Sequence, residues 1–401
     1  MNTEELRIAA STYGTPTYIF DVREVETRIR LLRSLLPEDT GLCFAVKANP
    51  FLIPYVADMV DRLDVCSPGE YEICIQEQIA PEKIVVSGVN KTYESMKRIL
   101  SYSKGAGIYT IESEEHAKIL RTLAEKNRMQ LSVLIRLSSG NQFGVDAETF
   151  IRLAEEVQES PYLTLAGVHY YAGTQKRQSK LEKEIDTLVA FAGTFEAETG
   201  TRLPELEYGA GMKVSYFVND SEKDQRESEP EPQIQALAEK LRACDAYGKK
   251  TIELGRFLVS MSGYYLTRVM DVKRTAQPGF VILDGGIHQI NYYGWMMGMK
   301  QPEIKVLAEK DGDDGELFHL CGSLCTVNDV LARDVTLHNP EKGDVICFRR
   351  CGAYAATEGM AMFLSRELPQ VLICRTDGKI EKLRDRVETY PFHGSGNWNR
   401  M

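Results

Sequence analysis

Eight short apolar runs separated by amphipathic stretches fill residues 43–256, and this alternation limits the fold more than any other feature. Strands of about four to eight residues that alternate with helices predict a parallel sheet. Eight such units match a (β/α)8 barrel, which takes about 250 residues. An open doubly wound sheet is the competing fold, but no GxGxxG motif follows the first run. The runs are 43–48, 63–67, 84–88, 107–112, 131–137, 165–173, 205–210 and 251–256, and the amphipathic stretches include 22–36, 113–127, 180–199 and 232–247.

After residue 257 helical periodicity nearly vanishes, and short strand-like segments separated by turn residues predict an antiparallel β domain. The strand-like segment 16–21 could join this domain. We therefore expect a barrel over 22–260 and a β domain built from 1–21 together with 261–401. The charged, proline-bearing segment 219–232 is expected to be a solvated loop. The expected strands are 262–274, 279–284, 303–308, 316–321, 334–338, 344–350, 370–375 and 379–385.

The charge balance of the 401 residues argues against a nucleic-acid partner. There are 48 Lys and Arg against 58 Asp and Glu, a net charge of −10, whereas nucleic-acid binding needs a basic face. No apolar run reaches the roughly 18 residues of a membrane span, and the acidic N-terminus lacks the apolar core of a signal peptide. The nine cysteines form no CxxC pair or zinc-ligand set, so we expect no metal and reduced thiols in a cytoplasmic protein.

Catalytic groups of barrel enzymes lie at the C-terminal ends of the strands. Lys47 ends the first run, where partial desolvation would lower its pKa and favour covalent chemistry with a carbonyl group. A solvated surface lysine is the alternative. Gly209-Ala210-Gly211 and Gly255-Arg256 suit a phosphate, although for the glycines taken alone a pair of tight turns is the favoured explanation. The polar and glycine residues at the strand ends are Lys47, Asp64, Ser67, Ser87, Arg136, Tyr171, Gly209, Gly211, Glu253, Gly255 and Arg256.

Six motifs, in order along the chain, carry a family resemblance. They are FAVKANP (44–50), GVHYYAGTQ (167–175), YGAGM (208–212), ELGR (253–256), CGSLCTVND (321–329) and GAY (352–354). With these motifs the sequence resembles the fold-type III pyridoxal-phosphate (PLP) decarboxylases, which include diaminopimelate and ornithine decarboxylases and share an alanine racemase-like barrel. Alanine racemases place an arginine where this chain has Glu253, so a racemase is a weaker alternative. A non-catalytic relative is weaker still, because the site residues are present.

This resemblance implies a role for each motif. Lys47 would bind the aldehyde of PLP and exchange it for the substrate amine, and Glu253 would face the pyridine nitrogen. Cys325 would return a proton to the substrate carbon. In the family, the cysteine and tyrosine motifs come from the partner subunit, so Cys325 and Tyr354 imply a homodimer with shared sites. The cofactor-binding residues implied are Lys47, Tyr171, Thr174, Gly209, Gly211, Glu253, Gly255, Arg256 and Tyr354.

Three departures from the family pattern concern the substrate. Thr326 stands where an acidic residue usually pairs with the distal ammonium of a diamino acid, although Asp329 could replace it. Tyr292 lies near the place of an arginine that holds the distal carboxylate of diaminopimelate. Tyr171 replaces a histidine that stacks on the cofactor ring, a place that another aromatic ring can fill.

These departures favour a substrate with a masked distal end. The chain is most similar to the branch that decarboxylates glutamyl groups on an acyl carrier protein, and the substrate is an L- or D-amino acid derivative. The apolar segment 292–299 could line a channel for it, with a core or dimer interface as the alternative. Lys176 and Arg177 could dock an acidic carrier protein, although solvated loop charges are the simpler reading. Diaminopimelate decarboxylase, which makes lysine, is the alternative function.

Overall fold

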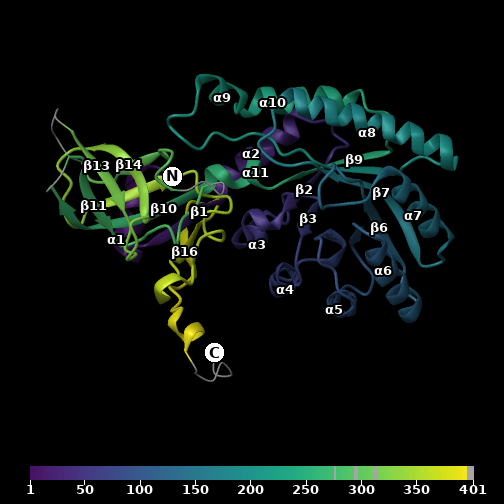
Figure 1. The fold of residues 1–401 in the computed structure, drawn as a ribbon, viewed down its shortest axis with the longest axis horizontal. Helices are drawn as coiled ribbons and strands as arrows, with labels where there is room; N and C mark the ends of the chain where they lie inside the picture. The colour runs from purple at the N-terminus through teal and green to yellow at the C-terminus, as the bar shows by residue number, and fades with distance from the viewer. Residues whose placement is uncertain (275–276, 293–296, 310–314, 395–401) are drawn as a thin grey trace. The chain divides into compact units, whose positions relative to one another are not determined.

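The computed structural model describes residues 1–274, 277–292, 297–309 and 315–394 (Figure 1). Contacts divide the chain into two compact units. One comprises Thr27–Val214 and Gln225–Leu258, and the other comprises Met1–Glu26, Ser215–Asp224 and Val259–Met401. We call them the barrel unit and the β unit. None of the helices in the described part of the chain has the length and apolar character needed to cross a membrane.

Eight parallel strands close into a barrel, which confirms the predicted fold. The first strand pairs in parallel with both its successor and the last strand, which closes the sheet. Barrel strands are covered on both faces, so they read as nearly continuous apolar runs. The strands are β2 (Gly41–Ala45), β3 (Arg62–Val65), β4 (Ile84–Val86), β5 (Ile108–Ile111), β6 (Leu131–Arg136), β7 (Leu163–Tyr171), β8 (Glu205–Gly209) and β9 (Lys249–Leu254).

Helices follow the strands and begin at residues suited to capping. Ser113 and Asp146 each accept a hydrogen bond from a backbone N–H of the first helical turn, at α6 and α7 respectively. The helices are α2 (Val22–Leu35), α3 (Ile53–Val56), α4 (Pro68–Gln76), α5 (Tyr93–Ser103), α6 (Glu114–Asn127), α7 (Ala147–Glu159), α8 (Gln178–Thr199), α9 (Glu222–Glu227), α10 (Pro230–Arg242) and α11 (Arg256–Val259). Short 3-10 turns are η1 (Val46–Ala48), η2 (Pro50–Leu52), η3 (Pro81–Lys83), η4 (Ser260–Ser262), η5 (Phe363–Ser365) and η6 (Tyr390–His393).

The segment 219–232 is not the loop that its composition predicts. It contains helix α9 and the start of α10. Pro230 occupies the first turn of α10, where its missing N–H costs nothing, and Glu231 follows it in a position favoured by the helix dipole. The same charged and proline residues that suggest a loop therefore suit the start of a helix.

The β unit is built around a nine-stranded sheet in the order β14-β13-β11-β10-β1-β16-β17, with β15 pairing to β10 and β12 to β15. Most pairs are antiparallel, as predicted, but β1 runs parallel to β16 and β11 to β13. The expected recruitment of segment 16–21 is confirmed, because β1 lies between β10 and β16. The elements are α1 (Thr3–Tyr13), β1 (Thr17–Asp21), β10 (Gly263–Lys273), β11 (Gly279–Leu283), β12 (Ile304–Val306), β13 (Glu316–Cys321), β14 (Val330–Leu337), β15 (Val345–Arg349), β16 (Gln370–Cys374) and β17 (Ile380–Arg384).

Candidate active site

Lys47 lies on the 3-10 turn η1, directly after strand β2, at the end of the barrel where catalytic groups gather. Its Nζ lies 3.9 Å from Oε1 of Glu253 and 4.0 Å from Oδ2 of Asp64. The Lys47 side chain is 38% exposed, whereas both carboxylates are buried. A small molecule that enters this end of the barrel can therefore reach the amine.

Glu253 ends strand β9 and has two cationic or hydrogen-bonding neighbours. His169 Nε2 lies 3.0 Å from its Oε2, and Lys47 lies on its other side. Burial alone would raise the pKa of Glu253, but the charge of Lys47 and the hydrogen bond from His169 lower that pKa to about 2. Burial and the charge of Glu253 instead raise the pKa of Asp64. The low pKa of Glu253 keeps this carboxylate ionised at neutral pH.

Tyr171 and two glycines form a narrow wall beside Lys47. The Tyr171 ring centroid lies 5.7 Å from Lys47 Nζ. A Cβ atom on Gly209 would lie 2.5 Å from the Tyr171 ring. Gly211 has φ +59°, and a Cβ there would lie 2.1 Å from the carbonyl oxygen of Gly173. Only glycine fits this close approach without a shift of the backbone.

The remaining predicted residues of the barrel unit lie at the same strand ends. Thr174 is half-buried in the loop after β7. Gly255 follows β9, and a Cβ there would lie 2.9 Å from Cβ of Ala48 on the Lys47 turn. Arg256 is buried at the first position of α11. The predicted cofactor residues of the barrel unit therefore all lie at or just after the carboxyl ends of barrel strands.

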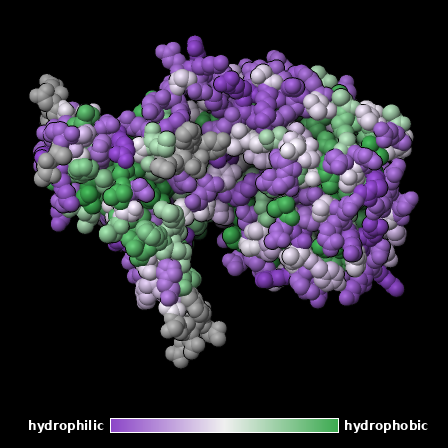
Figure 2. All heavy atoms as spheres, in the orientation of Figure 1, coloured by the Kyte–Doolittle hydropathy of each residue, from purple (hydrophilic) through white to green (hydrophobic). Residues whose placement is uncertain are grey.

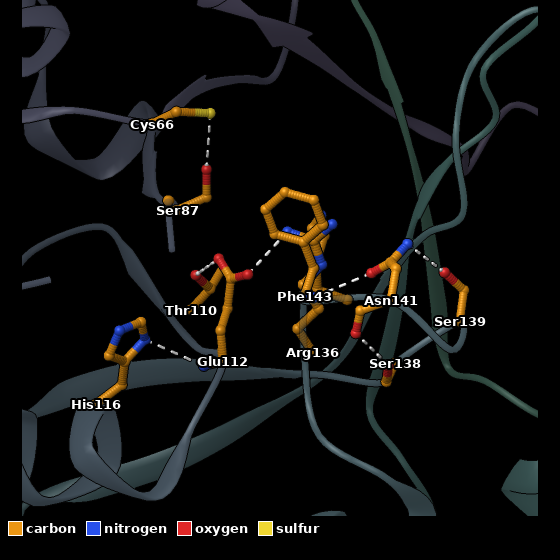
Figure 3. Close-up of polar contacts among 12 residues, drawn as sticks. Cys66, Ser87, Thr110, Glu112, His116, Arg136, Ser138, Ser139, Asn141 and Phe143 are labelled. Atoms are coloured by element: carbon orange, nitrogen blue, oxygen red, sulfur yellow. Dashed lines mark hydrogen bonds and ion pairs between the residues drawn. The ribbon is translucent and has the colours of Figure 1, made fainter. Parts of the chain in front are cut away.

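A polar cluster at the ends of β5 and β6 includes two residues that sequence reasoning missed (Figure 3). Arg136, a predicted strand end, donates to Glu112 at 2.9 Å, and its guanidinium lies 4.7 Å from the Phe143 ring centroid. Lys91 donates to Thr110 Oγ1 at 3.0 Å, and burial lowers its pKa to about 8 despite the nearby Glu112. Glu112 lies at the end of the predicted strand 107–112, and this position could have identified it as a site residue. Lys91 follows a loop, and no pattern in the sequence indicates its position.

A third missed residue, Glu207, lies buried on strand β8. Arg62 donates to Oε2 of Glu207 at 2.9 Å and to Oε1 of Glu205 at 2.7 Å. Donor or acceptor atoms of Glu207, His169 and Glu253 all lie within 4.8 Å of one another. Burial raises the pKa of Glu207 to about 7, against the opposing influence of His169 and Arg62. This carboxyl group therefore titrates in the physiological range.

The raised pKa of Glu207 predicts a pH-dependent stability that Glu207→Gln removes. The folded state holds a proton that the unfolded chain releases near pH 4.5, so the contribution is favourable at low pH and is lost as pH rises through about 7. The free energy of unfolding of Glu207→Gln, relative to the native chain, should therefore rise by about 2–3 kcal/mol between pH 5 and 8. Urea unfolding at several pH values measures this difference. A difference that stays constant with pH would contradict it.

The β unit carries the predicted cysteine motif on the loop between β13 and β14. Cys325 is exposed and Thr326 is half-buried. Asp329 is buried, and its two oxygens accept backbone N–H groups of Ile287 at 2.9 Å and Leu324 at 2.7 Å. Burial raises the pKa of Asp329. This carboxylate shapes the loop that presents Cys325.

The two tyrosines predicted for the site also belong to the β unit. Tyr354 is half-buried with φ +64°, and its carbonyl oxygen accepts from the backbone N–H of Glu358. Tyr292 is buried beside Tyr216, and its hydroxyl donates to the carbonyl oxygen of Arg349 at 2.6 Å. Of the predicted channel segment 292–299, residues 293–296 lie outside the described residues.

Comparison with known proteins identifies the family of this chain. Residues 22–260 match the model of the pyridoxal-dependent decarboxylases, pyridoxal binding domain. The chain belongs to the pyridoxal-dependent decarboxylases. It is similar to diaminopimelate decarboxylase of Pseudomonas aeruginosa, with 29% identity over 86% of this chain and 84% of that protein. It is also similar to the L-glutamyl-[BtrI acyl-carrier protein] decarboxylase of Niallia circulans, with 26% identity over 96% of this chain and 94% of that one.

Solved structures show the same fold. The diaminopimelate decarboxylase of Helicobacter pylori, complexed with L-lysine, superposes with a TM-score of 0.81 at 23% identity, over 97% of this chain and 98% of that one. This decarboxylase is therefore a PLP-dependent enzyme that acts on an amino acid. The residues at the barrel mouth fit PLP. An accessible amine suits the aldehyde, an ionised carboxylate suits the ring nitrogen, and Gly209 and Gly211 permit a close backbone approach that side chains would prevent.

Proposed function

We propose that this decarboxylase acts on an amino acid whose distal end is masked as an amide or thioester, as in a glutamyl group on an acyl carrier protein. Thr326 carries the proposal, because it places an uncharged side chain directly after Cys325. A buried ammonium without a partner anion costs several kcal/mol. A substrate that lacks the distal ammonium avoids that cost.

The contacts of Asp329 support the same substrate class. Both of its oxygens accept backbone N–H groups within their own unit, and the side chain is only 2% exposed. The Asp329 carboxylate is therefore already bound to the backbone of its own loop. A substrate without a distal ammonium does not require this carboxylate as a partner. The similarity to the glutamyl-carrier decarboxylase of Niallia circulans, over nearly the full length of both chains, points in the same direction.

The proposed mechanism assigns a proton or a contact to each residue. Lys47 Nζ would hold the cofactor aldehyde and exchange it for the substrate amine. Glu253 would remain ionised and hold a proton on the ring nitrogen, and Tyr171 would supply an aromatic face for the ring. PLP, when bound, would supply the electron sink that allows the substrate carboxylate to leave as CO2. Cys325 Sγ would donate a proton to the substrate α-carbon.

The phosphate of the cofactor would lie at the glycine loops. Backbone N–H groups around Gly209, Gly211 and Gly255 and the side chain of Thr174 supply donors for a phosphate. Arg256 and Tyr354 would add a guanidinium and a phenol. A Cβ on Gly211 would lie 2.1 Å from the carbonyl oxygen of Gly173, so this position of the loop favours glycine.

We further propose that the active unit is a homodimer in which Cys325 and Tyr354 act in the site of the partner chain. Large apolar side chains are exposed on the β unit, and green apolar atoms gather on its surface in Figure 2. Exposed apolar patches of this kind mark interaction surfaces, and a second copy of the chain is the partner that the shared site requires. The exposed side chains are Met360, Met362, Phe363, Leu364, Tyr390 and Phe392.

Diaminopimelate decarboxylase is the second candidate function. Several relatives across most of the chain carry that activity, at 24–30% identity. The Asp284-Gly285-Gly286 turn is also present. In those enzymes this turn precedes the arginine that holds the distal carboxylate of diaminopimelate. Rapid turnover of meso-diaminopimelate by the native enzyme would favour this candidate.

The deciding experiment measures CO2 release from meso-diaminopimelate, lysine, ornithine, arginine, glutamate and a glutamyl pantetheine thioester. We expect the thioester to be the best substrate, with kcat/KM at least about tenfold above the diamino acids. Thr326→Glu should reverse part of this preference, because it supplies the missing anion. Val327→Glu is the matched control, since it adds the same charge at a neighbouring side chain that is 92% exposed. Equal turnover of diamino acids by the native enzyme and Thr326→Glu would contradict the proposal.

A further inference from the structure

Lys176 lies two residues after Thr174 and is buried, although its sequence neighbourhood suggests a surface charge. Its side chain is 1% exposed, whereas that of the adjacent Arg177 is 63% exposed. Lys176 is therefore unavailable to dock a carrier protein. A buried ammonium next to an active site needs a reason.

The Lys176 ammonium is held by two oxygen atoms. It donates to Oε2 of Glu184 on helix α8 at 2.7 Å and to the carbonyl oxygen of Gly209 at 3.1 Å. Tyr208 donates its hydroxyl to the same Glu184 oxygen at 2.8 Å. Lys176 thus links an outer helix of the barrel to the first residue of the glycine loop.

The backbone around Lys176 joins the loop after β7 to the loop after β8. The Lys176 N–H donates to the carbonyl oxygen of Gly211 at 3.0 Å. The side-chain amide of Gln175 makes two hydrogen bonds with the backbone of Val214, at 2.8 and 2.7 Å. The Lys176 Cε atom lies 3.1 Å from the position that a Cβ of Gly211 would take. The lysine therefore packs directly behind the proposed phosphate loop.

Lys176 also faces the ring of Tyr171. Its Nζ lies 5.6 Å from the ring centroid, and Lys47 Nζ lies 5.7 Å from the same centroid. Ammonium groups at such distances are attracted to an aromatic face. Two lysines thus restrain the Tyr171 ring, which we assign to contact with the cofactor.

Stability alone does not account for this ion pair. Burial lowers the pKa of Lys176, which shows that the ammonium loses solvation that Glu184 only partly restores. Among the described residues, Oε1 of Glu184 has no hydrogen-bond partner although it is buried. Apolar residues of similar volume are often at least as stabilising as a buried ion pair.

We propose that Lys176 is a positioning residue of the cofactor site, which fixes the Gly209–Gly211 loop and the Tyr171 ring in the geometry that binds PLP. The inference rests on the cofactor site assigned under the proposed function. The contacts of Lys176 predict that removal of its ammonium loosens the loop after β7 and the loop after β8 together. One side chain binds the carbonyl oxygen of Gly209 and packs against Gly211. The effect should appear in cofactor affinity more than in the stability of the apoprotein.

The test compares Lys176→Met, Lys176→Arg and the control Lys180→Met in the full chain stripped of cofactor. Lys180 is exposed on α8, four residues further along. Titration with PLP, followed by absorbance, should show a dissociation constant about 10- to 100-fold higher for Lys176→Met, the loss expected for a charged hydrogen bond. Lys176→Arg keeps the charge and should recover part of this affinity. Lys180→Met should bind PLP like the native chain.

Thermal unfolding of the apoproteins separates positioning from folding. Unchanged PLP affinity in Lys176→Met would overturn the inference. A lower affinity that is matched by a large fall in apoprotein melting temperature, with no recovery in Lys176→Arg, would also overturn it, since the role would then be structural. Lys176→Arg and Glu184→Gln keep the test decisive if Lys176→Met does not fold.

One further variant distinguishes failure of this inference from failure of the site itself. Gly211→Ala places a methyl group where the carbonyl oxygen of Gly173 already lies, so it should weaken PLP binding whatever Lys176 does. If Gly211→Ala leaves PLP affinity unchanged, the assigned phosphate loop is wrong and the Lys176 inference falls with it. If Gly211→Ala weakens binding and Lys176→Met does not, only the Lys176 inference is wrong.

Discussion

Lys47→Ala is expected to lower kcat about 10³-fold or more, the largest loss of any single substitution in this enzyme. Lys47 is the amine that is both accessible at the barrel mouth and flanked by the carboxylates of Glu253 and Asp64. Alanine removes the amine that we propose holds the cofactor and takes the Lys47 cation away from two buried carboxylates. Decarboxylation and covalent cofactor attachment should therefore fail together.

Borohydride reduction followed by peptide mass spectrometry measures the attachment directly. The native enzyme should keep PLP on the peptide that contains Lys47, and Lys47→Ala should keep none. Lys97→Ala is the control, because Lys97 is an exposed lysine on α5. If Lys47→Ala retained borohydride-fixed PLP and a tenth of the native activity, another lysine would hold the cofactor.

The same variant tests the shared site of the proposed dimer. Cys325→Ala should also be inactive, since its Sγ is the proposed proton donor. A mixture of the two inactive variants, exchanged through mild denaturation, would form mixed dimers with one intact site each. Random pairing would restore about a quarter of the native activity. Absence of any recovery in a mixture shown to contain mixed dimers would place Cys325 in the site of its own chain.

The barrel was predictable because its signal is local. Eight apolar runs give eight strands, and for example the run 205–210 becomes β8 (Glu205–Gly209). Lys47 and Glu253 were predictable for the same reason, since each lies at the end of a run and the fold brings all such ends together. The motif order then supplied the family, which the comparisons confirm.

Charges buried inside the barrel were not predictable from the sequence. All five residues of β8 are buried, although Glu205 and Glu207 alternate with Leu206 and Tyr208, a pattern that by itself indicates a solvent-facing polar side for Glu207. Lys176 and Arg177 are adjacent and chemically alike, yet only the first is buried. Its partner Glu184 lies on the next helix, and a pattern read along the chain does not show which helical residue will meet a loop lysine. Long-range pairing likewise decides that β1 runs parallel to β16.

Glu253→Gln is the second substitution with a large expected effect, a fall in kcat of about 10²- to 10³-fold. Glutamine preserves the shape of the side chain but cannot carry the charge that the pKa of about 2 ensures in Glu253. Lys47 keeps Asp64 as a neighbour at 4.0 Å, and loss of the Glu253 charge removes one cause of the raised pKa of Asp64. The variant therefore isolates the effect on the ring nitrogen of the cofactor from the effect on the lysine.

Two further measurements distinguish an effect on the ring nitrogen from a loss of cofactor binding. PLP affinity, from absorbance titration, should change by much less than kcat, since the lysine and the glycine loop remain. The pH titration of the bound-cofactor spectrum should shift, because a neutral amide no longer favours a protonated ring nitrogen. Glu198→Gln, on an exposed side chain near the end of α8, makes the same chemical change at a distance from the site. A Glu253→Gln enzyme with kcat within tenfold of the native value and an unshifted spectrum would mean that His169 or another group, and not the ionised Glu253, sets the state of the ring.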